Sequence, residues 1–254
     1  MCGRYAASRN PADLVEEFEV EQVEVPEPLP PDYNVAPTKP VYAVLARRTR
    51  DSGDDEPPVR QLRVVRWGLV PSWAKDPSIG SRMINARMET VAEKPAFRRA
   101  FARRRCLLPA DGYYEWYASK QDGKTVKQPF FIHPKDGGVL AMAGLYEFWR
   151  PKDADPEDPD AWLTTCTVLT TNAEDALGRI HDRMPLLVEP ARYAEWLDPD
   201  VDDPDRLRSL LVPAAPGRLD AYPVSREVNN VRNNGERLLE PVPAEEPPAG
   251  ATLS

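Results

Sequence analysis

Short β-type runs separated by turn sequences are the feature that most limits how this chain can fold. Residues 60–68 alternate in polarity and residues 163–171 form a β-branched run with few charges, so we predict both to be strands. Turns containing Asp-Gly at residues 121–124 and 136–138 join further runs, as is typical of hairpins. We therefore predict an α+β fold, with a single domain built on a strongly bent mixed β-sheet or partial barrel and short helices at its periphery.

Helix signals in the sequence are few and short. Asn10 as N-cap and Pro11 at the first helical position predict the start of one helix. The pattern predicts a longer helix over residues 91–104 and a short one capped by Thr171 or Asn172. Two more are expected over residues 190–197 and 204–211.

The domain is predicted to cover residues 1–242. Residues 243–254 are rich in Pro and Ala and are expected to form a flexible tail. The sequence contains no internal repeat and no GxGxxG, Walker or HExxH motif, so the common nucleotide and metalloprotease signatures are absent.

Composition limits the compartment and the chemistry. The 254 residues include three cysteines, none in a CxxC pair, and two histidines, His133 and His181, without ligand spacing. Neither a disulfide framework nor a zinc site is expected. No apolar run approaches the ~20 residues of a membrane helix, and the first residues do not resemble a signal peptide. We expect a cytoplasmic protein that uses no metal and no cofactor.

Charge is distributed unevenly along the chain. The net charge is −8, yet residues 60–105 contain twelve Lys and Arg against three acids. A basic block inside an acidic protein is typical of a localised phosphate-binding groove. The five arginines between residues 98 and 105 fit a solvated helix face equally well, and the sequence does not separate these interpretations.

The chain begins with Met1-Cys2, and removal of Met1 would leave Cys2 with a free α-amine beside its thiol. An α-amine has a pKa of about 7.7–8 and a cysteine thiol about 8.5, so part of the amine is uncharged near neutral pH and modest tuning would supply thiolate. Such an aminothiol condenses with an aldehyde to an imine, which the thiol closes to a thiazolidine. The alternative is that Cys2 is an ordinary residue of a fraying terminus.

Several other side chains have both a chemical and a structural interpretation. Glu115 lies on an aromatic strand, where burial would raise its pKa and suit it to acid–base catalysis; on a wet face it would be inert. His181 follows a predicted helix end, whose dipole favours the charged imidazole. Trp67 and Trp73 flank a Gly/Pro turn and suit either base stacking or core packing. Asn85 could equally be a turn residue that bonds its own backbone.

Seven short motifs occur in an order that resembles one family. They are Met1-Cys2-Gly3-Arg4-Tyr5, Tyr33-Asn34-Val35-Ala36-Pro37, Trp67-Gly68-Leu69-Val70-Pro71, Asn85-Ala86-Arg87-Met88-Glu89-Thr90, Gly112-Tyr113-Tyr114-Glu115-Trp116, His181-Asp182-Arg183-Met184-Pro185 and Pro223-Val224-Ser225. Each motif alone is weak. Together, over about residues 2–242, they are similar to the SOS-response-associated peptidase (SRAP) family, which shields abasic sites in single-stranded DNA.

The resemblance implies an enzyme with two linked activities. It implies a peptidase that removes its own Met1, after which Cys2 forms a thiazolidine crosslink with the ring-opened aldehyde of an abasic site. It further implies that Asn85 orients Cys2 and its adduct and that Glu115 shuttles protons. His181 would act as acid or base on the sugar ring oxygen and in reversal of the crosslink.

The partner that the resemblance implies is single-stranded DNA containing abasic sites, bound by a monomer that associates with the damaged nucleoid. Contacts to that DNA are implied for Arg4, Asn34, Pro37, Trp67, Trp73, Arg87, Arg98 and Arg99.

Two other function classes are compatible with parts of the sequence. N-terminal-nucleophile amidotransferases also begin Met-Cys-Gly and use the thiol on an amide. They usually continue with Ile and a Gly-rich strand, whereas Arg4 and Tyr5 follow here. A single-strand-binding module would use Trp and Arg without covalent chemistry.

Overall fold

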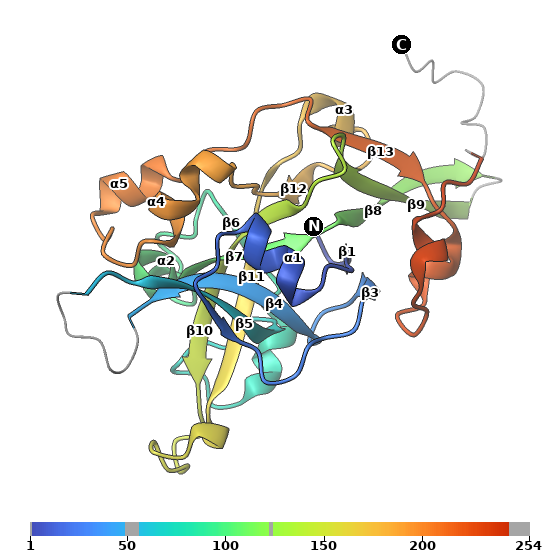
Figure 1. Cartoon of the computed structure of the whole chain (residues 1–254). Coiled ribbons are helices and arrows are strands. Elements are labelled where there is room, and N and C mark those ends of the chain that lie inside the picture. The colour runs from blue at the N-terminus through green and yellow to red at the C-terminus, as the bar shows by residue number, and fades with distance from the viewer. Residues whose placement is uncertain (1, 49–55, 122–123, 244–254) are drawn as a thin grey trace.

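The computed structural model describes residues 2–48, 56–121 and 124–243, and it confirms the predicted fold class (Figure 1). Two β-sheets account for most of the regular secondary structure, and short helices lie around them in a single domain. The predicted tail beyond residue 243 lies outside the described residues. Among the residues that are described, no helix has the length and apolar character needed to cross a membrane.

The larger sheet bends until two of its strands meet. Its strands are β2 (Gln22–Glu24), β4 (Pro40–Arg47), β5 (Val59–Trp67), β6 (Asn85–Arg87), β7 (Arg105–Ala110), β10 (Leu140–Trp149), β11 (Leu163–Asn172) and β12 (Arg183–Pro185). They follow the order β12-β11-β10-β7-β4-β5-β2, and β11 also pairs in parallel with β5 at Cys166 and Trp67. That extra pairing joins β11, β10, β7, β4 and β5 into a ring, which is the partial barrel that the sequence predicted.

The smaller sheet encloses the start of the chain. Its strands are β1 (Tyr5–Ala7), β3 (Asp32–Val35), β8 (Gly112–Gln121), β9 (Lys124–Pro134) and β13 (Leu219–Pro223). They follow the order β13-β9-β8-β1-β3, so β1 is an interior strand (Figure 1). Tyr5 pairs with Val35 on one side and with Tyr113 on the other. The N-terminal segment is therefore held by hydrogen bonds on both edges and does not fray.

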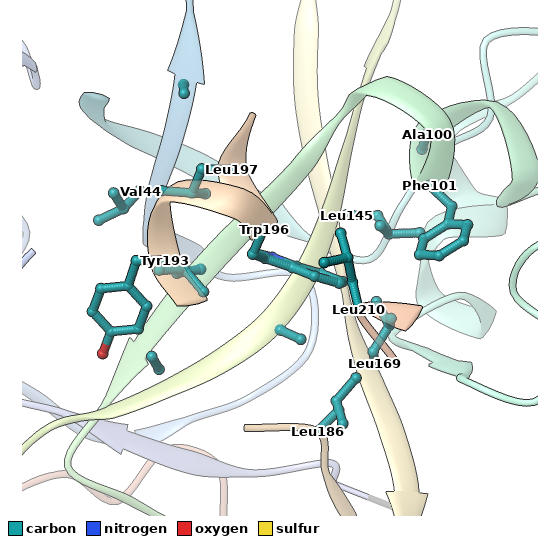
Figure 2. Packing of buried hydrophobic residues seen from close by; sticks show 14 of the residues in the cluster. Val44, Ala100, Phe101, Leu145, Leu169, Leu186, Tyr193, Trp196, Leu197 and Leu210 are labelled. Carbon is teal, nitrogen blue, oxygen red and sulfur yellow. The ribbon is translucent and has the colours of Figure 1, made fainter. Parts of the chain in front are cut away.

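Two large clusters of buried apolar side chains hold the sheets and helices together. The first, which we call the Trp196 cluster, surrounds Trp196 of α4 (Tyr193–Leu197) with side chains such as Leu145 and Leu210 (Figure 2). The second, which we call the Cys2 cluster, contains Cys2 and Tyr113 together with other buried side chains of both sheets. The N-terminal cysteine is thus part of a hydrophobic core.

Several predicted helices are confirmed. The helix α1 (Pro11–Glu17) begins as expected, because the Asn10 side chain accepts a hydrogen bond of 3.0 Å from the Asp13 backbone N–H. The short η3 (Pro190–Arg192) runs into α4, and α5 (Pro204–Ser209) follows within its predicted range. The remaining 3-10 turns are η1 (Pro77–Arg82), η2 (Pro159–Ala161), η4 (Arg226–Asn229) and η5 (Glu236–Leu239).

Two helix predictions are wrong in extent. The helix expected over residues 91–104 is only α2 (Arg98–Arg103), and turns occupy residues 88–93 and 95–97. Pro95 has no N–H to donate and its ring clashes with the preceding turn, so the helix starts after it. The helix expected to be capped by Thr171 or Asn172 is α3 (Asp175–Gly178), with Glu174 as N-cap, because β11 continues through Asn172.

Candidate functional site

Cys2 lies at the entry to β1 and is completely buried. The backbone around it is fixed, since the Tyr114 N–H donates to the Arg4 carbonyl at 2.9 Å, next to the β1–β8 ladder. The interpretation of Cys2 as part of a fraying terminus is therefore wrong. The sheet holds this residue in one position, as a reactive group requires.

Asn85 is brought directly to Cys2, although the two residues are far apart in the sequence. Its side-chain Nδ2 donates to the Cys2 carbonyl oxygen at 2.8 Å. The cause is the parallel pairing of β6 with β11, which sets Asn85 opposite Val168. The Asn85 Oδ1 atom is buried and has no hydrogen-bond partner among the described residues. Asn85 is thus not a turn residue that bonds its own backbone; it holds Cys2 and keeps an acceptor available beside it.

Glu115 lies on β8 and is 3% exposed. Burial raises the pKa of its carboxyl to about 7, because a buried carboxylate loses its hydration. A carboxyl with this pKa gives and takes protons readily at neutral pH. The charge of Glu115 also raises the pKa of the Cys2 thiol, so the two groups share one electrostatic environment.

The pKa of the Cys2 thiol differs from the value expected from the sequence. Burial, and then the charge of Glu115, raise its pKa far above the ordinary value, although a backbone hydrogen bond from Arg4 acts in the opposite direction. In the chain that carries Met1 the thiol is therefore not tuned towards thiolate, and the tuning expected after removal of Met1 stays a prediction. The sulfur is held as a neutral thiol, and a base must take its proton during any reaction.

His181 lies three residues after the end of α3, with its side chain 32% exposed. Its Nδ1 accepts from the Arg183 backbone N–H at 3.0 Å, and the exposed Asp182 carboxylate lies 3.0 Å from the same nitrogen. Burial lowers the pKa of His181 and outweighs the opposing effect of Asp182. The expectation of a charged imidazole at a helix end is wrong, because desolvation dominates. The neutral ring can carry its proton on Nε2.

The loop that carries His181 lies within electrostatic reach of Glu115. The charge of Asp182 contributes to the raised pKa of Glu115. The structure therefore brings Cys2, Asn85 and Glu115 together, with the His181 loop beside them. Among the residues in the described ranges, no group of three or more His, Cys, Asp or Glu side chains could hold a metal ion.

Arg183 and Glu89 were not singled out from the sequence, yet they connect two parts of the site. The guanidinium of Arg183 is 8% exposed and binds both Glu89 carboxylate oxygens, at 2.7 and 3.0 Å. It also donates to the Asn172 Oδ1 and the Thr170 carbonyl, each at 2.7 Å. This network ties the segment after Asn85 to the strand after His181. Both residues stand inside quoted motifs, which was the only available signal.

Trp67 does not have the exposure that a base-stacking residue needs. The side chain is fully buried and its Nε1 donates to the Ile84 carbonyl at 2.9 Å. Its ring meets Tyr5 edge to face, with centroids 5.2 Å apart. The predicted DNA contact of Trp67 is contradicted, because the junction of β5 and β11 encloses the residue. The core-packing alternative holds for this tryptophan.

The Asn34 side chain also makes its hydrogen bonds within the protein. It is fully buried, and its Nδ2 donates to the carbonyls of Val228, Asn230 and Asn233 at 3.3, 3.0 and 2.9 Å. Its Oδ1 accepts a 2.8 Å hydrogen bond from Arg4. A DNA contact by Asn34 is therefore contradicted, since its amide fastens the 228–233 loop. Arg4 is half-buried against this loop, and its own DNA contact stays a prediction.

The remaining predicted contact residues reach the surface to different degrees. Trp73 is 54% exposed, Arg87, Arg98 and Arg99 are exposed, and Pro37 is half-buried. Their DNA contacts stay predictions. Arg87 has the most direct link to the site, because it lies two residues along β6 from Asn85.

The basic block after residue 98 divides into two parts. Arg103 pairs with Asp202 at 2.6 Å, Arg104 pairs with Glu147 at 2.8 Å, and Arg105 is buried among backbone carbonyls. The last three arginines of the block are therefore used within the protein. Arg98 and Arg99 are exposed and are not paired in this way with any described residue, whereas Arg103 is exposed but shares an ion pair with Asp202.

Comparison of this chain with known proteins finds relatives that share one family description. A family model described as SOS response associated peptidase (SRAP) matches residues 1–231. The abasic site processing protein YoqW of Bacillus subtilis is 40% identical over 240 residues, covering 94% of this chain and 99% of the relative. The abasic site processing protein YedK of Escherichia coli is 35% identical over 251 residues, covering 95% and 100%.

The fold agrees with these sequence matches. A crystal structure of a protein from Bacteroides thetaiotaomicron superposes with a TM-score of 0.76 at 24% identity, covering 95% of this chain and all of that one. The seven motifs, the family match and relatives of nearly equal length point the same way. This chain belongs to the SOS response associated peptidase (SRAP) family.

Proposed function

We propose that this protein processes abasic sites in single-stranded DNA by forming a covalent crosslink through Cys2 after Met1 is removed. The relatives named above as abasic site processing proteins support this substrate. The observation that carries the proposal is the hydrogen bond from Asn85 to the Cys2 carbonyl, next to a carboxyl whose pKa is about 7. The fold therefore holds its second residue next to a side chain that suits acid–base catalysis.

The proposed reaction joins Cys2 to the open-chain sugar and releases one water. The α-amine of Cys2 adds to the C1 aldehyde, forming an N–C bond and a carbinolamine. Loss of the hydroxyl as water gives an imine. The thiol then adds to the imine carbon, forming an S–C bond, and its proton ends on the nitrogen. The product is a five-membered thiazolidine in which no atom has been oxidised or reduced.

Glu115 is the proton carrier in this scheme. With a pKa of about 7 it can accept a proton from the ammonium of Cys2 and return one to the departing hydroxyl. It can also take the proton of the Cys2 thiol, which burial keeps neutral. The same carboxyl is suited to activate water for hydrolysis of the Met1–Cys2 peptide bond.

Asn85 and His181 have supporting roles in the proposal. Asn85 fixes the Cys2 carbonyl through Nδ2, and its Oδ1, which has no partner among the described residues, can accept from the new α-amine. His181, whose pKa burial lowers, can donate a hydrogen bond from Nε2–H to the sugar ring oxygen, and its imidazolium form can give that oxygen a proton. Trp73 and Arg87 are the exposed candidates for contact with the DNA strand. We expect a monomer to suffice, since one chain holds all these groups.

The proposal is tested with a single-stranded oligonucleotide that carries one abasic site. We expect the wild-type protein to form an adduct that survives denaturation and Cys2→Ala to form none. Cys166→Ala is a matched control, because Cys166 is equally buried in the Cys2 cluster and has no part in the reaction. An adduct that persists in Cys2→Ala, or one that Cys166→Ala also abolishes, would contradict the proposal.

Retention of Met1 gives a second test. A variant with an uncleavable N-terminal extension keeps the Cys2 nitrogen as an amide, which cannot form an imine. We expect this form to give no crosslink although it binds the oligonucleotide. Release of ammonia from glutamine by the processed protein, without any crosslink, would support the amidotransferase alternative instead.

A further inference from the structure

Tyr113 is a buried residue of β8 whose polar atom is not used by the fold. The side chain is 0% exposed, pairs across the ladder with Tyr5 and lies two residues before Glu115, hence on the same strand face. Its hydroxyl makes no hydrogen bond with any residue in the described ranges. A buried hydroxyl without a partner is destabilising, so phenylalanine would suit packing alone better.

The neighbouring tyrosine shows that this fold can satisfy a buried hydroxyl on the same strand. Tyr114 is equally buried but points to the opposite face of β8, where its hydroxyl donates to the Tyr33 carbonyl at 2.7 Å. The unpartnered hydroxyl of Tyr113 is therefore a local property of the face that carries Glu115. It does not reflect a general shortage of acceptors around the strand.

The Tyr113 hydroxyl belongs to the environment of the reactive cysteine. Burial raises its pKa well above the ordinary value, and the charges of Cys2 and then Glu115 add to the rise. The phenol therefore stays protonated and can donate a hydrogen bond to an anionic or carbonyl oxygen. A second unpartnered buried atom, the Asn85 Oδ1, lies on the residue that bonds Cys2. Near Cys2, one buried donor (the Tyr113 hydroxyl) and one buried acceptor (the Asn85 Oδ1) thus have no hydrogen-bond partner among the described residues.

We propose that the Tyr113 hydroxyl donates a hydrogen bond to the aldehyde oxygen of the open-chain abasic sugar while the Cys2 amine adds to the carbonyl carbon. This inference rests on the proposed function. As the N–C bond forms, the C=O π electrons move onto the oxygen, and the hydroxyl stabilises that charge without giving up its proton. The proton that the ammonium loses passes through Glu115 to the same oxygen, which later leaves as water. Tyr113 is then a catalytic residue that no motif comparison requires.

The test compares Tyr113→Phe with Tyr114→Phe, two variants that each lose one buried hydroxyl from adjacent positions. The imine formed with an abasic-site oligonucleotide is trapped with sodium borohydride in single-turnover experiments. We expect Tyr113→Phe to slow imine formation at least about tenfold, since one donor to a developing oxyanion contributes about 10²–10³ in favourable cases. Tyr114→Phe should stay within about twofold of the wild-type rate.

Binding of an oligonucleotide with a tetrahydrofuran abasic analogue separates chemistry from recognition. This analogue has no aldehyde, so Tyr113→Phe should bind it as tightly as the wild type. Thermal unfolding should show Tyr113→Phe at least as stable as the wild type. An unchanged imine rate in Tyr113→Phe, equal slowing in Tyr114→Phe, or weaker binding of the analogue would each overturn the inference while the proposed function stands. If the wild type forms no adduct, both fail.

Discussion

The surroundings of the Trp196 cluster and of the Cys2 cluster differ in how fully their buried polar groups are paired. In the first, all five N–H donors of the buried Arg105 bind backbone carbonyls, and the Trp196 Nε1 donates to the Cys106 carbonyl at 2.8 Å. Around the second, the Trp67 Nε1 donates to the Ile84 carbonyl, but the Asn85 Oδ1 and the Tyr113 hydroxyl have no partner among the described residues.

This difference separates a region built for stability from one built for chemistry. A satisfied buried network stabilises and rigidifies a fold, whereas each unpartnered polar atom costs about 1–3 kcal/mol. We expect a protein to retain this cost in stability where the substrate supplies the missing hydrogen-bond partner. Glu115, whose pKa is about 7, shares the electrostatic environment of Cys2. Substitutions in the two regions should therefore have opposite consequences for stability and activity.

The largest expected effect is the loss of stability in Arg105→Met. Burial lowers the pKa of Arg105 only to about 10, so the guanidinium is charged at neutral pH and its removal leaves several carbonyls unpaired. We expect the free energy of unfolding to fall by about 3–5 kcal/mol, measured by chemical denaturation. The crosslinking rate of the molecules that remain folded should not change. A loss below about 1 kcal/mol would show that the satisfied network contributes little.

The next effect is a gain of stability in Glu115→Gln. The pKa of Glu115 is about 7 in the folded chain and about 4.3 in an unfolded one, so the folded state binds the proton more tightly. Its contribution to stability is therefore present at low pH and lost as the pH rises from about 4 to 7. At pH 8 we expect Glu115→Gln to be about 3–4 kcal/mol more stable than the wild type, with crosslinking slowed by about 10²–10⁴-fold.

The pH dependence provides the control for that variant. Below about pH 4 the stability advantage of Glu115→Gln should disappear, because the wild-type carboxyl is then protonated in both states. An advantage that is equal at pH 4 and pH 8 would mean that the raised pKa is not its cause. An unchanged crosslinking rate would remove Glu115 from the mechanism.

The smallest expected effect concerns Glu89, which joins the two halves of the site through Arg183. The carboxylate is 41% exposed, so the ion pair contributes modestly despite its bidentate geometry. We expect Glu89→Gln to lower the free energy of unfolding by about 1 kcal/mol at pH 7. Crosslinking should slow by less than about tenfold, because Asn85 and His181 lose a shared support.

The pH profile again identifies the cause. The hydrogen bond from Arg183 lowers the pKa of Glu89, so the stability it provides is lost as the pH falls through that value. The wild type and Glu89→Gln should therefore converge in acid. A variant that is less stable by the same amount at every pH would point to lost packing instead.

The sequence predicted the partial barrel because its strands and turns are local features. Asn10 and Pro11, for example, start α1 where expected. The closeness of Asn85 and Cys2 followed only from resemblance, since it depends on the long-range pairing of β6 with β11. The burial of Trp67 was equally beyond local inspection, because β5 and β11 meet around it only when the ring closes.

The ionisation states were the least predictable part of the site. A helix end beside His181 suggested a charged ring, and an α-amine beside Cys2 suggested a tuned thiol. Burial lowers the pKa of His181 and raises that of Cys2, in each case favouring the neutral form. Desolvation depends on every element packed around a group, and a single strand or helix does not reveal it.

The most direct test of the account is the mass of the N-terminal peptide after a crosslinked sample is digested with nuclease and protease. We predict a peptide that lacks Met1 and carries the sugar on Cys2, at the summed mass minus one water. Its thiol should be closed to alkylation, because the sulfur is part of the thiazolidine ring. A sugar found on a lysine, or on a peptide that still carries Met1, would contradict the central claim.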